Sequence, residues 1–284
     1  MLSLSLTPSS INFCEADYVG TSPWGTAPYL AERWNSLSSL IYCLFALWGM
    51  KGVWLQVKTG DTFFLAVYLA LHSTLGVIGL GSFLLHGCLC WIGQVLDELP
   101  MCYLCMVMLY FLLNHDATNE QPSPQGVGKS PRHTLFFLAL SVLVTAFYLR
   151  MQRFYIAFMV TFSVLVHSMV ILLGYRAYKS GKKGWMFFLA SFVCSFLIAV
   201  PCWWAEHKRC NQTLQDDNTT TGEGGGDPPT TINLHIVWHV FTAVAVYLAF
   251  NSVVSIRYSN KNHIQILWIQ RLLPLAVPGE KRKN

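Results

Sequence analysis

The sequence predicts an all-α integral membrane protein built as a seven-transmembrane helix bundle. Of the 284 residues, 54% are hydrophobic and only 12% are charged, and the mean hydropathy is +0.43. A soluble domain carries about 25% charged residues. Seven apolar segments are long enough to cross a bilayer as helices, which takes about 17–25 residues each. The Lys and Arg residues lie between these segments and form no basic patch, which argues against a nucleic-acid partner.

The predicted spans divide the chain into three parts. These are an N-terminal segment (1–35), the bundle (36–258) and a C-terminal tail (259–284). The segment 1–13 has neither a basic region nor a long apolar core, so we expect no cleaved signal peptide. The seven spans are 36–57, 63–85, 95–113, 134–149, 154–175, 185–204 and 234–256.

Charge placement orients the spans. Most of the 19 Lys and Arg residues fall on the side that holds the C-terminus, so the positive-inside rule predicts a lumenal N-terminus and a cytosolic C-terminus. The loop 206–231 then lies on the outer side and carries glycosylation sequons at Asn211 and Asn218. Chance sequons are common, so their use stays open. In the tail, Pro274 and Pro278 interrupt the apolar stretch 264–277, which favours an interfacial segment over an eighth span.

Histidines in two predicted spans suggest a metal site. His235 and His239 are four residues apart, so on a helix their side chains lie on one face. Structural zinc sites use four protein ligands, whereas catalytic sites use three and keep one position for water. His86, at the end of the second predicted span, is the best third ligand. The predicted topology brings all three to the same membrane depth.

Two further side chains fit hydrolytic chemistry at that depth. Ser82 lies one helical turn before His86, and Asp97 begins the next predicted span. A metal, a hydroxyl donor and a carboxylate together are the requirements of metal-assisted hydrolysis. Each residue also has a structural interpretation. Ser82 could bond to a carbonyl of its own helix, and Asp97 could stabilise the start of one.

Oxygen-bearing side chains gather ahead of the first predicted span. Asn12, Glu15 and Asp17 are closely spaced, and Glu32 follows. Calcium takes six to eight oxygen ligands, so this set suits calcium better than zinc. On spacing alone, a solvated acidic loop is the simpler interpretation.

Four motifs, in order along nearly the whole chain, resemble the alkaline ceramidases, seven-span hydrolases related to the adiponectin receptors. They are Glu32-Arg-Trp-Asn-Ser, Gly81-Ser-x-x-x-His86, Leu96-Asp-Glu-Leu-Pro100 and His235-x-x-x-His239. The resemblance implies zinc held by His86, His235 and His239. It also implies calcium bound by Asn12, the backbone carbonyl of Phe13, Glu15, Asp17 and Glu32.

The resemblance carries one departure and one further implication. Family members tend to have Asp at the first calcium position and Asn at the third, whereas this chain has Asn12 and Asp17, which keeps the charge and ligand number. Cys14 and Cys210 resemble the positions of a family disulfide. Both lie on the oxidising side in the predicted topology.

The expected reaction is hydrolysis of ceramide to a sphingoid base and a fatty acid. Asp97 would move the proton, and Ser82 would donate a hydrogen bond to the developing oxyanion. We expect the partners to be a ceramide-type lipid and the bilayer, without an obligate protein partner. The expected location is the endoplasmic reticulum or the Golgi.

Two other functional classes were weighed. A zinc-containing seven-span receptor would be expected to offer an extramembrane ligand domain, which this chain lacks. An ion transporter would carry polar groups through the whole membrane depth, whereas the inner halves of these spans read as almost wholly apolar. His72, His167, Glu98 and most of the cysteines are expected to lie outside the site, with Cys102 and Cys105 as packing residues.

Overall fold

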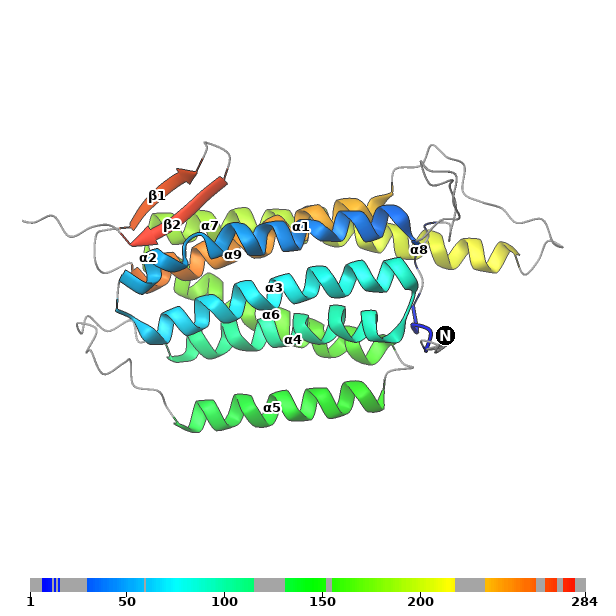
Figure 1. Ribbon diagram of the computed structural model, residues 1–284, viewed down its shortest axis with the longest axis horizontal. Helices are drawn as coiled ribbons and strands as arrows, with labels where there is room; N and C mark the ends of the chain where they lie inside the picture. The colour runs from blue at the N-terminus through cyan, green and yellow to red at the C-terminus, as the bar shows by residue number, and fades with distance from the viewer. Residues whose placement is uncertain are drawn as a thin grey trace, which may run out of the picture.

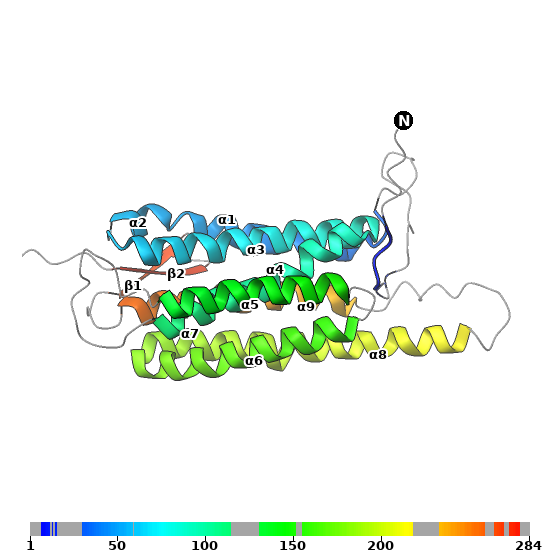
Figure 2. The same ribbon diagram turned by 90° about the horizontal axis from the view of Figure 1, so that it is seen from below.

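The computed structural model is almost entirely helical. It describes residues 7–11, 13, 15, 30–58, 60–114, 131–151, 155–217, 233–258, 264–269 and 273–278. The helices lie roughly along one long axis (Figures 1 and 2). They are α1 (Arg33–Met50), α2 (Val53–Lys58), α3 (Thr62–Cys88), α4 (Trp91–Asn114), α5 (Pro131–Arg150), α6 (Tyr155–Ser180), α7 (Lys182–Phe192), a π-helical turn η1 (Val193–Ala199), α8 (Val200–Asp217) and α9 (Leu234–Tyr258).

Six of the predicted spans correspond to helices that are long and apolar enough to cross a membrane. In the described part of the chain these are α3, α4, α5, α6, the continuous stretch Lys182–Lys208 and α9. The first predicted span differs, because a break at Lys51 and Gly52 separates α1 from the short α2. Arg33, Asn35 and several serines also lower the hydropathy of α1. The helical membrane protein is confirmed, whereas the first predicted span, and with it the count of seven, is not.

The sixth predicted span continues further than expected. We predicted a loop from residue 206, but α8 remains helical to Asp217, because residues 205–217 contain no proline or glycine. Pro201 lies just after η1. Proline lacks an N–H and its ring crowds the carbonyl four residues earlier, and the wider π turn accommodates this. Asn211 lies within α8, and Asn218 falls outside the described residues.

The C-terminal tail forms a β-hairpin, which corrects the strictly all-α prediction. Strand β1 (Ile264–Ile269) pairs antiparallel with β2 (Leu273–Pro278), in a register from Ile264–Pro278 to Ile269–Leu273. Isoleucines and a tryptophan favour strands, and the prolines oppose a helix. The hairpin packs beside α2 and α9 (Figure 1).

Close backbone packing joins α3 to α4 near the predicted site. A Cβ at Gly81 would overlap the backbone of Leu96 and Asp97, and one at Gly93 would overlap the backbone of Leu84 and Leu85. Only glycine allows this approach, which holds Ser82 and Asp97 on facing helices.

Buried polar groups at the hairpin end show that one expectation was wrong. The inner halves of the spans are not almost wholly apolar, since Asn251, Ser252 and Ser255 of α9 are buried there. Asn251 and Ser252 donate to backbone carbonyls, and Arg257 pairs with Asp61 at 2.5 Å. The Asn251 bond lies within α9, whereas the Ser252 and Arg257 contacts join α9 to α7 and to the start of α3, so all three serve the fold.

The cysteines follow the packing prediction with one exception. Cys43, Cys102, Cys105 and Cys194 are free, and Cys102 and Cys105 are buried. Cys88 and Cys90 form a disulfide across Leu89, the left-handed residue that ends α3. The predicted Cys14–Cys210 pair falls outside the described side chains.

Candidate metal centre

The three predicted zinc ligands come together at one end of the bundle. His86 lies in the last turn of α3, while His235 and His239 lie in the first turns of α9. All three are buried, and their candidate ligand nitrogens lie within 4.8 Å of one another. Ring centroids are 4.9 Å apart for His86–His235, 5.2 Å for His86–His239 and 4.5 Å for His235–His239.

An asparagine sets the start of α9 and therefore the position of two histidines. The Asn233 side-chain oxygen accepts the backbone N–H groups of His235 at 3.0 Å and Ile236 at 3.3 Å, an N-cap arrangement. The Asn233 amide donates to the Asn35 side chain at 2.9 Å, which ties α9 to α1. From this start, His235 and His239 face the same side.

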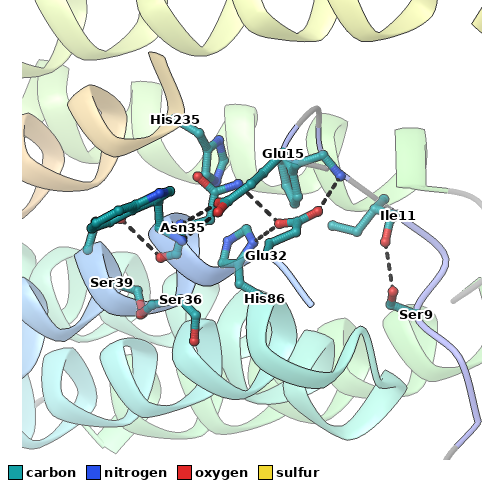
Figure 3. A network of polar contacts seen from close by, with 12 residues as sticks. Ser9, Ile11, Glu15, Glu32, Asn35, Ser36, Ser39, His86 and His235 are labelled. Carbon is teal, nitrogen blue, oxygen red and sulfur yellow. Dashed lines mark hydrogen bonds and ion pairs between the residues drawn. The ribbon is translucent and has the colours of Figure 1, made fainter. Parts of the chain in front are cut away.

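Neighbouring side chains orient two of the rings. The Nδ1 of His86 pairs with the Glu32 carboxylate (Figure 3), so Nδ1 carries the proton and Nε2 stays free. The Ser38 hydroxyl donates to the Asn35 carbonyl at 3.0 Å and therefore accepts from Nδ1 of His239, at 2.7 Å. This again leaves Nε2 free. Such outer partners fix the ring orientation of metal-binding histidines.

Two ring nitrogens of the cluster lack hydrogen-bond partners among the described residues, which bears on whether a metal fits. Among the described residues, the buried His86 Nε2 and His235 Nδ1 have no hydrogen-bond partner. Buried polar atoms are nearly always satisfied, so two such atoms in one cluster indicate a missing ligand. Three nitrogen ligands suit a zinc ion that keeps its fourth coordination position open for water or substrate.

Ser82 and Asp97 lie on facing helices near the end of α3 that holds His86. The Ser82 side chain hydrogen-bonds to the Asp97 carboxylate, across the glycine contact between α3 and α4. Ser82 is buried, one turn before His86, whereas Asp97 keeps part of its surface accessible. The predicted hydroxyl and carboxylate are therefore a bonded pair next to one of the histidines.

Tyr42 of α1 connects the pair to the histidines. Its ring meets the His239 ring edge-on, with centroids 5.8 Å apart, and it also lies within electrostatic range of Asp97. The Tyr42 hydroxyl is 2.5 Å from the Thr242 hydroxyl. Sequence reasoning missed Tyr42 and Ser38, although their spacing of four residues places both on one face of α1.

The N-terminal segment covers the histidines. Phe13 packs on His235 and His86, with ring centroids 4.1 Å and 4.9 Å apart. Its backbone N–H donates to Glu32 at 2.8 Å. Phe13 was predicted only as a calcium ligand through its carbonyl. Its side chain in fact packs against two of the three clustered histidines.

Two of the predicted calcium ligands lie near each other at the start of α1. Glu15 accepts the backbone N–H groups of Trp34 at 2.6 Å and Asn35 at 2.8 Å, and it interacts electrostatically with Glu32 (Figure 3). Burial raises the pKa of Glu15 above its ordinary value, and the negative Glu32 adds to this, while the two N–H donors oppose it. Asn12 and Asp17 lie outside the described residues.

The other expectations for the neighbourhood also hold. His72 bonds to the Tyr68 carbonyl at 2.9 Å and His167 to the Ser163 carbonyl at 2.7 Å, so both are hydrogen-bonded residues of their helices. Glu98 follows Asp97 but is held by Gln94 and Tyr148, away from Ser82.

Fold and site together define a helical membrane protein with a buried three-histidine centre beside a serine–aspartate pair. The ceramidase family model matches residues 6–277. The chain therefore belongs to the ceramidase family, which confirms the prediction of a ceramidase enzyme at the level of the family. It is 28% identical to alkaline ceramidase 3 of Mus musculus over 248 residues, which cover 85% of this chain and 81% of the relative. It is also 25% identical to an alkaline ceramidase of Arabidopsis thaliana over 242 residues, with 85% and 81% covered.

Proposed function

We propose that this protein is a zinc-dependent amidohydrolase that cleaves a ceramide-type lipid. The observation that carries the proposal is the buried histidine cluster, with ligand nitrogens within 4.8 Å of one another, beside the bonded pair Ser82 and Asp97. The reaction adds water across an amide bond and yields a fatty-acid carboxylate and the ammonium form of a sphingoid base. The ring nitrogens of His86, His235 and His239 would hold the metal. When bound, zinc would supply a Lewis acid that activates water and polarises the amide carbonyl.

Asp97 and Ser82 handle the proton and the developing charge. Asp97 accepts a proton from the attacking water and delivers it to the amine that leaves, which requires the accessible surface that it keeps. Ser82 shifts its hydrogen bond from Asp97 to the carbonyl oxygen as negative charge grows there, a role worth about 3–4 kcal/mol at comparable sites. Glu32 and Ser38 keep the rings of His86 and His239 oriented.

The first experiment measures fatty acid released from ceramide by detergent-purified protein, together with its zinc content. Wild type is compared with His235→Ala and Asp97→Asn. We expect the histidine variant to lose zinc and activity together. The aspartate variant should keep zinc and lose activity by about 100-fold or more, the scale of one acid–base group. Wild type with stoichiometric zinc and no hydrolysis of any ceramide would contradict the proposal and favour the zinc-receptor alternative.

We also propose that calcium binds the N-terminal segment and stabilises the site. Support comes from the two neighbouring carboxylates of Glu15 and Glu32. Glu32 contacts both Phe13 and His86, which would link a calcium ion to the histidine cluster. A cation would also offset the cost of burying the negative charge of Glu15. Asn12, Asp17 and the Phe13 carbonyl complete the proposed set. A calcium-selective chelator should lower activity while zinc stays bound. Activity that is indifferent to calcium would count against this role.

The topology completes the proposal. We propose seven spans, with α1 and α2 as the first, and a lumenal histidine end in the endoplasmic reticulum or the Golgi, because positive charges gather at the opposite side. Protease access to the C-terminal tail from the lumenal side of sealed vesicles would contradict it.

A further inference from the structure

A buried carboxylate that the proposed mechanism does not use lies beside the active site. Glu98 is 3% exposed, and its two carboxylate oxygens have separate partners. Gln94 donates to one at 3.1 Å and the Tyr148 hydroxyl donates to the other at 2.6 Å. Gln94 in turn accepts the backbone N–H of Ser10 at 2.8 Å. Residues of α4, α5 and the N-terminal segment therefore hold this carboxylate in one position.

Glu98 lacks a countercharge. Among the described residues, no Lys, Arg or His pairs with it, and its partners Gln94 and Tyr148 are neutral. Carboxylates within a membrane-spanning bundle are costly, and they usually mark a place where a charged ligand or ion is handled. A cation in this place would supply the countercharge that the described residues do not.

Glu98 also lines a small, partly open pocket between α4, α5 and α6. Apart from a few polar groups, the lining is apolar and includes Val144, Phe147 and Phe158. Phe147 is 45% exposed, so the lining continues onto the outer surface of α5. These three helices lie next to one another in the bundle (Figures 1 and 2). The Glu98 carboxylate therefore lies in an apolar pocket that reaches the lipid-facing surface. Such a pocket suits an amphiphile with a polar head and an apolar chain.

The pocket adjoins the proposed base. Tyr148 and Tyr155 both line it, and both lie within electrostatic range of Asp97 as well as Glu98. An amine released near Asp97 is protonated at neutral pH, since alkyl amines have pKa values of about 10. It would need to cross only the width of α4 to meet the second carboxylate.

We propose that the pocket between α4, α5 and α6 binds the long-chain ammonium product, with Glu98 as its counter-ion. This assignment rests on the proposed function, because amide hydrolysis is the source of the amine. The apolar lining holds the start of the alkyl chain, and the exposed edge at Phe147 lets the rest extend into the bilayer.

The test is equilibrium binding of sphingosine to the detergent-purified, zinc-loaded protein. A long-chain diol with a hydroxyl in place of the amine is the neutral probe. Glu98→Gln keeps an acceptor for Tyr148 but removes the charge. We expect it to weaken sphingosine binding by about tenfold or more, as for loss of a charge-assisted hydrogen bond, and to leave diol binding and zinc content unchanged. Tyr148→Phe keeps the charge and should weaken sphingosine binding by less.

A second pair of variants tests the pocket without touching Glu98. Ala157→Phe places a ring in the pocket and should weaken both sphingosine and diol binding. Ile156→Phe is the control, because Ile156 is the next residue of α6 and is 68% exposed. It should change neither.

The outcomes separate this proposal from the proposed function. Equal weakening of sphingosine and diol in Glu98→Gln would overturn recognition of an ammonium group. Sphingosine binding that is unchanged in both Glu98→Gln and Ala157→Phe would overturn the pocket, even if the protein hydrolyses ceramide. Glu98-dependent sphingosine binding by a protein that hydrolyses no ceramide would support the pocket and reject the proposed function.

Discussion

The helices that carry the metal centre differ from those that surround it. In their most apolar stretches, 50% of α3, 61% of α4 and 67% of α9 are buried, compared with 17% of α5, 22% of α6 and 11% of Lys182–Lys208. The first group, with α1, forms an inner layer joined by glycine contacts and polar bonds. The second forms an outer layer that exposes many large apolar side chains. Chemistry that depends on geometry lies in the inner layer, where packing fixes each side chain.

The largest effect should follow from forcing α3 and α4 apart. Gly81→Ala places a methyl group against the backbone of Leu96 and Asp97, so it should displace Asp97 and lower ceramide hydrolysis by about 100-fold or more. Gly76→Ala makes the same change on α3, where the new Cβ would lie 3.6 Å from that of Ala46, an ordinary contact. It should keep full activity. Equal activity of the two variants would show that the close approach at Gly81 is unimportant.

A smaller effect should follow from removing a support of the metal centre. Ser38→Ala deletes the partner of His239 Nδ1 and should weaken zinc binding by about 10- to 100-fold, as measured by competition with a chelator. Ser39→Ala is the matched control, because the Ser39 hydroxyl bonds only to the Ser36 carbonyl of its own helix, at 2.7 Å. If both variants bind zinc as wild type does, the support is not functional.

The smallest effects on activity should come from the outer layer, where a substitution can lower the stability of the fold without touching the site. Leu173 and Ile171 are both on α6, but Leu173 is 2% exposed and Ile171 is 73% exposed. Leu173→Ala should cost about 2–5 kcal/mol of stability by opening a cavity. Ile171→Ala should cost within about 0.5 kcal/mol, as at ordinary surface positions. Thermal unfolding in detergent measures both. A similar loss in the two variants would argue against lipid exposure of this face.

The three clustered histidines were accessible to sequence reasoning because helical periodicity and span order restrict where a side chain can lie. The spacing of His235 and His239, and the order of the spans that places His86 at the same end, were enough to predict the cluster. Ser82 and Asp97 followed from the same geometry. The side chains that position the histidines, rather than belonging to the cluster, showed no such pattern in the sequence. Ser38 and Tyr42 resemble ordinary span residues until α9 is packed against α1.

Errors in the predicted elements arose where local composition was ambiguous. Residues 206–217 are polar, which suggested a loop, but they can also continue a helix that has already formed. The tail was apolar and interrupted by prolines, which fits an interfacial segment and also an edge hairpin. The interpretation of Glu98 as a residue outside the site was incomplete, because a pocket formed by three helices cannot be read from one of them.

The sequence by itself determined the membrane environment, the helical class, the family and the three histidines that cluster. These follow from composition, from the helical period and from short motifs, all of which are local properties of the chain. Only the tertiary structure decided which nitrogens of His86 and His239 have hydrogen-bond partners, that Phe13 packs on the cluster, and that Glu98 faces a pocket without a countercharge among the described residues. Each of these depends on contacts between segments far apart in the chain, and only packing brings such segments together.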